Sequence, residues 1–171
     1  MSKLKVKNNL GNLKYQIKYI KSKEKELQDW SIESANNFIS EYSRLISIQG
    51  RSGEVPPPLS PATHKIQKTF GKPDGSGIRD YLEVSYNKDN RGNLIATAYI
   101  NDSKAQMIAS VQEYGALIPV TEKMRGKLAF AGIFLRSDTK YIRIPARYAW
   151  KKAYNNTIKE SKRKLKDILN S

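Results

Sequence analysis

The chain has 171 residues, no cysteine and a formal charge of +15, from 31 Lys and Arg against 16 Asp and Glu. This length suits one hydrophobic core, so we expect a single domain over residues 1–171. The lack of cysteine excludes disulfide frameworks and thiolate chemistry. No apolar run approaches the roughly 18 residues of a membrane span, and no membrane partner is expected.

The first fifty residues predict a short strand and two helices. Leu4 and Val6 alternate with lysines, which is typical of an edge strand with charge on its solvent side. A first helix is expected from Asn9, because the apolar residues that follow have helical spacing. Those residues are Leu10, Leu13, Ile17 and Ile20. Asp29 or Ser31 then suits the N-cap of a second helix that runs to about residue 48.

Residues 53–80 are rich in proline and glycine, which forbids any long element. Long loops in compact domains are usually functional or mobile, so we interpret this segment as an extended arm that orders on a neighbouring subunit. The candidate inter-subunit residues of the arm are Pro57, Pro58, Leu59, Ser60 and Pro61. Ser60 and Pro61 can also begin a short helix, as its N-cap and first helical residue.

The middle of the chain predicts a hairpin followed by a helix. Residues 81–86 and 94–100 are β-rich runs joined by turn-forming residues. Asp102 or Ser103 is expected to cap the next helix, which Gly115 ends. We expect the inward side chains of that helix to be Met107, Ile108 and Val111.

The last third predicts two strands, a short helix and a long basic helix. Residues 117–120 are extended, and Thr121 can cap a short helix after them. Residues 141–144 alternate as a strand that must end at Pro145, because proline has no N–H to donate to a ladder. Residues 146–171 are expected to form the basic carboxyl-terminal helix.

Together these elements predict an α+β fold, a mostly antiparallel sheet packed by helices, with a long Pro/Gly-rich arm and a basic carboxyl-terminal helix. Ile144 is expected to be buried in that fold. Arg147 is expected at the helix start, free to pair with a neighbouring subunit or a nearby carboxylate. Several tyrosines are expected to be at least half buried. They are Tyr42, Tyr81, Tyr99 and Tyr114.

No catalytic, cofactor or metal site is predicted, and we do not expect an enzyme. His64 is the only histidine, and a single imidazole makes neither a metal site nor a relay without partners. Asp74, Asp80 and Glu83 lie close in sequence, but their spacing does not require them to converge as a pair of acids or a two-metal site must. A metal-dependent hydrolase that uses these three carboxylates is the less favoured alternative.

A candidate basic surface follows Trp150. Its residues are Lys151, Lys152, Lys162, Arg163 and Lys164. Such a field attracts nucleic acid, anionic membranes or acidic protein surfaces without distinguishing among them. A basic nucleic-acid-binding protein is therefore a second functional hypothesis, although no motif for reading base edges is present.

Six short segments occur in a characteristic order over roughly residues 55–155. They are PPLSPAT at 57–63, NDS at 101–103, QEYG at 112–115, IPVT at 118–121, KMR at 123–125 and IPARY at 144–148. In order and approximate spacing they resemble a phage virion-morphogenesis family, the tail-completion and head–tail joining (neck) proteins. On this resemblance the motif residues with structural roles are Tyr114, Gly115, Pro119, Ile144, Pro145 and Arg147.

The resemblance implies a structural virion protein that forms a homo-oligomeric ring, a hexamer, at the tail end or neck. Such a protein completes the tail and joins it to the head, as a tail terminator, tail-completion protein or head–tail connector. The implied partners are further copies of the chain, the tail tube protein and head–neck connector proteins, with non-specific contact to packaged DNA. The implied location is the virion, with the host cytoplasm during assembly.

Overall fold

The computed structural model describes residues 9–48, 60–71 and 77–170. Its helices and strands are α1 (Asn9–Ser47), α2 (Pro61–Phe70), the short 3-10 helix η2 (Arg79–Tyr81), β1 (Leu82–Lys88), β2 (Leu94–Ile100), α3 (Ser103–Tyr114), β3 (Ala116–Pro119), α4 (Glu122–Phe130), β4 (Tyr141–Ile144) and α5 (Ala149–Asn170). The predicted α+β class is confirmed, with a long carboxyl-terminal helix. The strands form two separate antiparallel pairs, β1–β2 and β3–β4, instead of one sheet.

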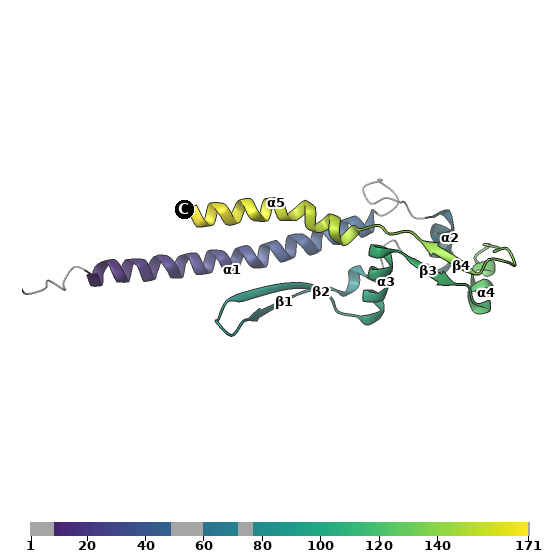
Figure 1. The fold of residues 1–171 in the computed structure, drawn as a ribbon, viewed down its shortest axis with the longest axis horizontal. Helices are drawn as coiled ribbons and strands as arrows, with labels where there is room; N and C mark the ends of the chain where they lie inside the picture. Colours follow the sequence, from purple (N-terminus) through teal and green to yellow (C-terminus); the bar gives the residue numbers. More distant parts are fainter. Residues whose placement is uncertain (1–8, 49–59, 72–76, 171) are drawn as a thin grey trace, which may run out of the picture.

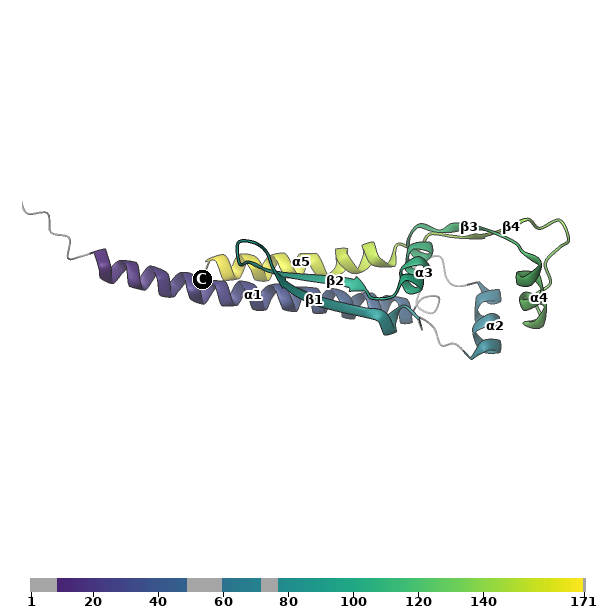
Figure 2. The same ribbon diagram turned by 90° about the horizontal axis from the view of Figure 1, so that it is seen from below.

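The molecule is elongated and has two parts (Figures 1 and 2). The first part, here called the stalk, comprises α1, α5 and the β1–β2 hairpin, which lie side by side. The second part, here called the head, comprises α2, α4, the β3–β4 ribbon and the loop of residues 131–140. Helix α3 lies between the two parts, at the end of the stalk.

Helix α1 runs without a break from Asn9 to Ser47, so the prediction of two helices divided at Asp29 or Ser31 is wrong. Neither residue is needed as a cap where the helix continues, because the amides that follow already bond to the preceding turn. Trp30 lies between them, and its indole Nε1–H donates to the carbonyl of Ser161 on α5 at 2.8 Å. This contact with α5 therefore outweighs the cap propensities of the two residues.

Helices α1 and α5 pack antiparallel along the stalk (Figure 1). Their contact is polar toward the free end, where Ser34 and Ser161 share a hydrogen bond of 2.7 Å. Asn156 also donates to the carboxylate of Glu41 at 2.7 Å across the same interface. The two helices can approach each other closely at Ala153 of α5, because this side chain is small; it is completely buried.

The β1–β2 hairpin lies against α1 (Figure 2). Leu82 pairs with Ile100 and Val84 pairs with Ala98 on the face that is more buried. On the opposite face Glu83 pairs with Tyr99 and accepts a hydrogen bond of 2.8 Å from its hydroxyl. The hairpin therefore has the apolar-in, polar-out alternation of a sheet that is covered on one side.

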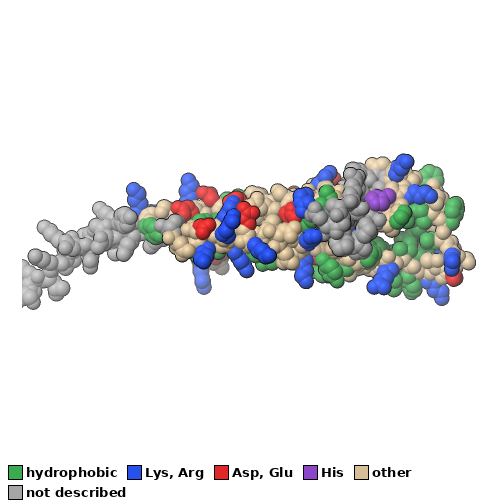
Figure 3. Space-filling view, turned by 90° about the horizontal axis from the view of Figure 1, so that it is seen from above, with side chains coloured by type: hydrophobic (Ala, Val, Ile, Leu, Met, Phe, Trp, Pro, Cys, Tyr) green, Lys and Arg blue, Asp and Glu red, His purple; other side chains and the backbone are tan. Residues whose placement is uncertain are grey.

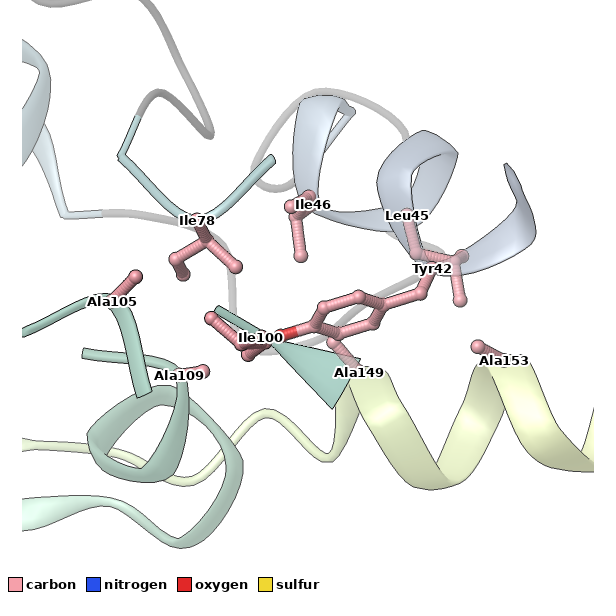
Figure 4. Packing of buried hydrophobic residues seen from close by; sticks show 9 residues of the cluster. All are labelled: Tyr42, Leu45, Ile46, Ile78, Ile100, Ala105, Ala109, Ala149 and Ala153. Atoms are coloured by element: carbon pink, nitrogen blue, oxygen red, sulfur yellow. The ribbon is translucent and has the colours of Figure 1, made fainter. Parts of the chain in front are cut away.

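The core lies where the stalk meets α3 (Figure 4). Its buried members are Tyr42, Leu45, Ile46, Ile78, Ile100, Ala105, Ala109, Ala149 and Ala153. The ring of Trp150 contacts Phe38 and Tyr42 edge-on, with ring centroids 4.6 and 4.9 Å away. Full burial of each large apolar side chain contributes about 1.5–3 kcal/mol, so this cluster holds the stalk together.

The inward face of α3 differs from the prediction. Ala105 and Ala109 are the buried residues of this helix, whereas Met107 is 63% exposed and Ile108 is 43% exposed. Small side chains allow α3 to approach β2 and α5 closely, and Met107 and Ile108 then fall on the outer side, whereas Val111 is half-buried. The cap prediction is confirmed, because the carboxylate of Asp102 accepts from the amide of Ala105 at 2.7 Å.

Part of the predicted arm is helical. Ser60 caps α2, since its hydroxyl accepts from the amide of Thr63 at 3.2 Å, and Pro61 is the first helical residue as predicted. Pro57, Pro58 and Leu59 lie outside the described residues, as do Leu4, Val6 and Asp74. The later elements agree closely with expectation, including β2, the Thr121 cap of α4 and the end of β4 at Ile144.

Candidate assembly surface

Two of the short motifs meet at one junction between the stalk and the head. Gly115 ends α3 with φ +76° and ψ 171°, a conformation that only glycine adopts readily. A Cβ atom at this position would lie 2.7 Å from the carbonyl oxygen of Ile144 and 2.8 Å from the amide nitrogen of Ala146. Across the same contact the amide of Arg147 donates to the carbonyl of Gln112 at 2.8 Å. The chain segments 112–115 and 144–148 are therefore pressed backbone to backbone.

Glu113 fixes the start of α5 from across this junction. Its two carboxylate oxygens accept from the backbone amides of Trp150 at 2.8 Å and Lys151 at 3.1 Å. A carboxylate is favoured there because the first amides of a helix have no partner within the helix. Tyr148 precedes α5 with φ +54°, a strained value for a residue that is not glycine. The carboxylate of Glu113 thus fixes the first turn of α5 directly after the sharp turn at Tyr148.

Arg147 and Ile144 do not lie as predicted. Arg147 is 7% exposed and engaged within the chain, and burial lowers the pKa of its guanidinium. The expectation that it is free for a neighbouring subunit is therefore wrong. Ile144 is only half-buried, because no described helix or further strand packs along the β3–β4 ribbon to which it belongs. Tyr114 and Tyr81 are 75% and 43% exposed, so the prediction of burial holds for Tyr42 and Tyr99 only.

The β3–β4 ribbon carries the rest of the head away from the stalk (Figure 2). Leu117 pairs with Arg143 and Pro119 pairs with Tyr141, and all four side chains of this face are exposed. Within the described residues, no helix packs along the ribbon and no third strand joins it. An isolated two-stranded ribbon is marginal in water. Its open edges and bare face are the features of an unfinished sheet.

The head exposes large apolar side chains and buries almost none. Among its described side chains only Ala131 is fully buried. Phe134 is 83% exposed, Phe130 78%, Leu117 63% and Tyr141 55%. Hydrophobic atoms gather at this end of the molecule in Figure 3, whereas acidic groups are concentrated along the stalk. Large apolar side chains exposed together at one end of a molecule are typical of an interaction site.

Sequence reasoning missed these phenylalanines, although a signal was present. Residues 128–135 read LAFAGIFL, eight residues without a polar side chain. The run is too short for a membrane span and is interrupted by Gly132, which has φ +71°. An apolar run that no core absorbs indicates a contact surface. Arg125 holds the following loop in place by donating to the carbonyls of Arg136 at 2.9 Å and Thr139 at 2.6 Å.

A groove of about 650 Å³ separates α2 from α4. It is lined mainly by apolar side chains, namely Ile66, Phe70, Met124 and Leu128, with Thr121, Lys123 and Lys127 completing it. The ammonium of Lys65 donates to the carbonyl of Gly132 at 3.1 Å, and the rings of Phe70 and Phe130 lie 6.3 Å apart. Two helices thus face each other with few direct contacts and an apolar space between them.

The predicted basic surface divides between inner and outer positions of α5. Lys164 bonds to Glu33 of α1, and this hydrogen bond lowers the pKa of the Glu33 carboxyl. Lys152 is half-buried and engaged, whereas Lys151, Lys162 and Arg163 are exposed. Part of the predicted basic surface, namely Lys152 and Lys164, is therefore engaged in contacts within the chain.

The residues weighed for catalysis are dispersed. Glu83 lies on the outer face of β1, where hydrogen bonds from Asn101 and Tyr99 lower its pKa. His64 is exposed on α2 (Figure 3). In the described parts of the chain, no group of three His, Cys, Asp or Glu residues could hold a metal ion. No described helix is long and apolar enough to cross a membrane.

Comparison with protein-family models, with curated proteins and with solved structures gave no match for this chain.

Proposed function

We propose that this chain is a structural subunit of a phage virion, which assembles into a ring at the tail end or neck and joins tail to head. The observation that carries the proposal is the head, in which Ala131 is the only described side chain that is fully buried, while Phe130 is 78% exposed and Phe134 is 83% exposed. Apolar surface left in water contributes nothing to the folding of a monomer. In an assembly, neighbouring subunits would cover this surface and remove it from water.

The junction gives this surface a fixed direction. Gly115 presses its backbone against residues 144–146, and the carboxylate of Glu113 binds the first amides of α5, so the ribbon leaves the stalk at a defined angle. A ring requires head-to-tail contacts between two different faces, and the rotation between neighbours must be constant for it to close. The resemblance of the segments 112–115 and 144–148 to tail-completion proteins concerns the residues that set this angle.

Electron microscopy of the purified protein, alone and mixed with tails of the phage that encodes it, tests the proposal. We expect ring-shaped particles and a density at the tail end when the protein is added. Single subunits that never associate with one another, with tails or with capsids would overturn the proposal.

A further inference from the structure

We infer that the groove between α2 and α4 binds an acidic amphipathic segment of a second, different protein, with apolar side chains seated in the groove and carboxylates on its lysine rim. The inference rests on the proposed role in assembly and deepens it, because it names a docking surface and the chemistry of the partner.

The shape and lining of the groove favour an apolar occupant. Ile66 and Phe70 come from α2, and Met124 and Leu128 face them from α4. The spacing of four residues on each helix places each pair one turn apart, on one face. Two helices that present such stripes across an open space form the kind of cleft into which a third amphipathic segment docks. Methionine in the lining suits this role, because its flexible side chain adapts to different surfaces.

The charge around the groove favours an acidic occupant. Residues 60–71 and 115–145 contain eight Lys and Arg against two acids, a formal charge of +6. Lys123 and Lys127 line the groove itself and are exposed. The two acids are Glu122 and Asp138, and neither lines it. An occupant with carboxylates beside its apolar anchors would find cations on the rim, and complementary charge also speeds the encounter.

A second copy of this chain fits the groove less well. The whole chain carries +15, and its stalk helix α5 is itself basic. Three of the five carboxylates of α1 are already in ion pairs, because Glu26 pairs with Lys23, Glu33 pairs with Lys164, and Glu41 pairs with Arg44. With 31 Lys and Arg against 16 Asp and Glu, a neighbouring copy would bring a surplus of positive charge to the lysine rim, so the occupant that we infer is a different, acidic protein.

The inference is tested by fluorescence anisotropy with a synthetic, fluorescein-labelled helix of about 18 residues, roughly 27 Å long. One peptide carries leucine and phenylalanine on one face and glutamate on the other, and its counterpart carries lysine in place of glutamate. The full-length protein is compared with the double variant Lys123→Glu, Lys127→Glu. The matched control is Lys159→Glu, Lys162→Glu, which makes the same charge change at exposed positions of α5.

We expect the acidic peptide to bind, the basic peptide not to bind, and the groove variant to weaken binding at least about tenfold while the control changes it less than about twofold. Met124→Glu should abolish binding by filling the groove with charge, with unchanged circular dichroism as the folding check. The inference is overturned if neither peptide binds, if the control weakens binding as much as the groove variant, or if the groove variant alters only self-association. Light scattering without peptide reports ring formation separately, so a failure of the proposed function is distinguishable.

Discussion

Substitution of Gly115 by alanine perturbs the junction on which the direction of the head depends. The backbone there has φ +76° and ψ 171°, in a region that residues other than glycine enter at a cost of about 1–3 kcal/mol. The new methyl group would also meet the carbonyl oxygen of Ile144 at 2.7 Å and the amide nitrogen of Ala146 at 2.8 Å. Both are backbone atoms, so they move only if the β3–β4 pairing or the start of α5 moves.

The expected loss of stability follows from these two effects. Overpacking against atoms that cannot turn aside typically costs about 1–3 kcal/mol, and with the backbone cost the total is about 2–6 kcal/mol. A domain of this size has roughly 5–15 kcal/mol of stability in all. Gly115→Ala should therefore consume a large part of it, although only one methyl group is added.

Gly126→Ala is the matched control, because a Cβ atom at Gly126 of α4 meets nothing within 4 Å. The same chemical change there should be neutral or stabilise by up to about 1 kcal/mol, since alanine is the better helix former. Urea unfolding followed by far-ultraviolet circular dichroism gives the free energy of unfolding by linear extrapolation. If the free energies of unfolding of Gly115→Ala and Gly126→Ala agree within about 1 kcal/mol, the close backbone contact at Gly115 is wrong.

Four further outcomes are expected. Met107→Ala should change the free energy of unfolding by less than about 0.5 kcal/mol, whereas Ala109→Leu should lower it by about 1–3 kcal/mol. If urea titrations show that Met107→Ala is the more destabilising of the two, the buried face of α3 has been assigned wrongly. Glu113→Ala should cost about 1–2 kcal/mol through loss of the bonds to the first amides of α5, measured by thermal unfolding against the wild type. A hydrogen bond from Arg44 holds the pKa of the Glu41 carboxyl below its usual 4.5. The ionised carboxylate therefore contributes stability above pH 4.5, and this contribution is lost as the pH falls through the folded-state pKa. Glu41→Gln should flatten this part of the pH–stability profile, and an unchanged profile would count against the Glu41–Arg44 pair. Free subunits should bind duplex DNA only with the weak affinity of non-specific contacts, about 10⁻⁴–10⁻⁶ M at physiological salt, and much tighter binding in a filter assay would favour the nucleic-acid alternative.

The sequence was most informative where local chemistry decides the structure. The Asp102 and Thr121 caps, the hairpin and the end of β4 before Pro145 are each determined by a few neighbouring residues. It was least informative where distant segments compete. The unbroken α1 depends on contacts such as that between Trp30 and α5. Residues 29–31 alone do not indicate that such a contact forms.

The candidate surface was predictable only in part. The segments 112–115 and 144–148 stand out in the sequence, but their backbone contact depends on how two distant segments cross, which spacing cannot reveal. Helical periodicity placed Met107 inward because it assumes that the largest apolar residues face the core. Here close packing selects alanine instead, and the excess apolar surface lies outside. The same assumption hid Phe130 and Phe134, which a single chain leaves exposed.

The central claim is that the head is completed by other subunits, and the mass of the particle in solution tests it most directly. Light scattering after gel filtration, from about 1 µM to about 1 mM, should show a closed particle whose mass is a multiple of 19.5 kDa. The double variant Phe130→Glu, Phe134→Glu should remain a folded monomer, whereas Leu169→Glu, at a 62% exposed position at the end of α5, should assemble as the wild type does. A wild-type monomer at every concentration, or assembly that the head variant leaves unchanged, would contradict the account.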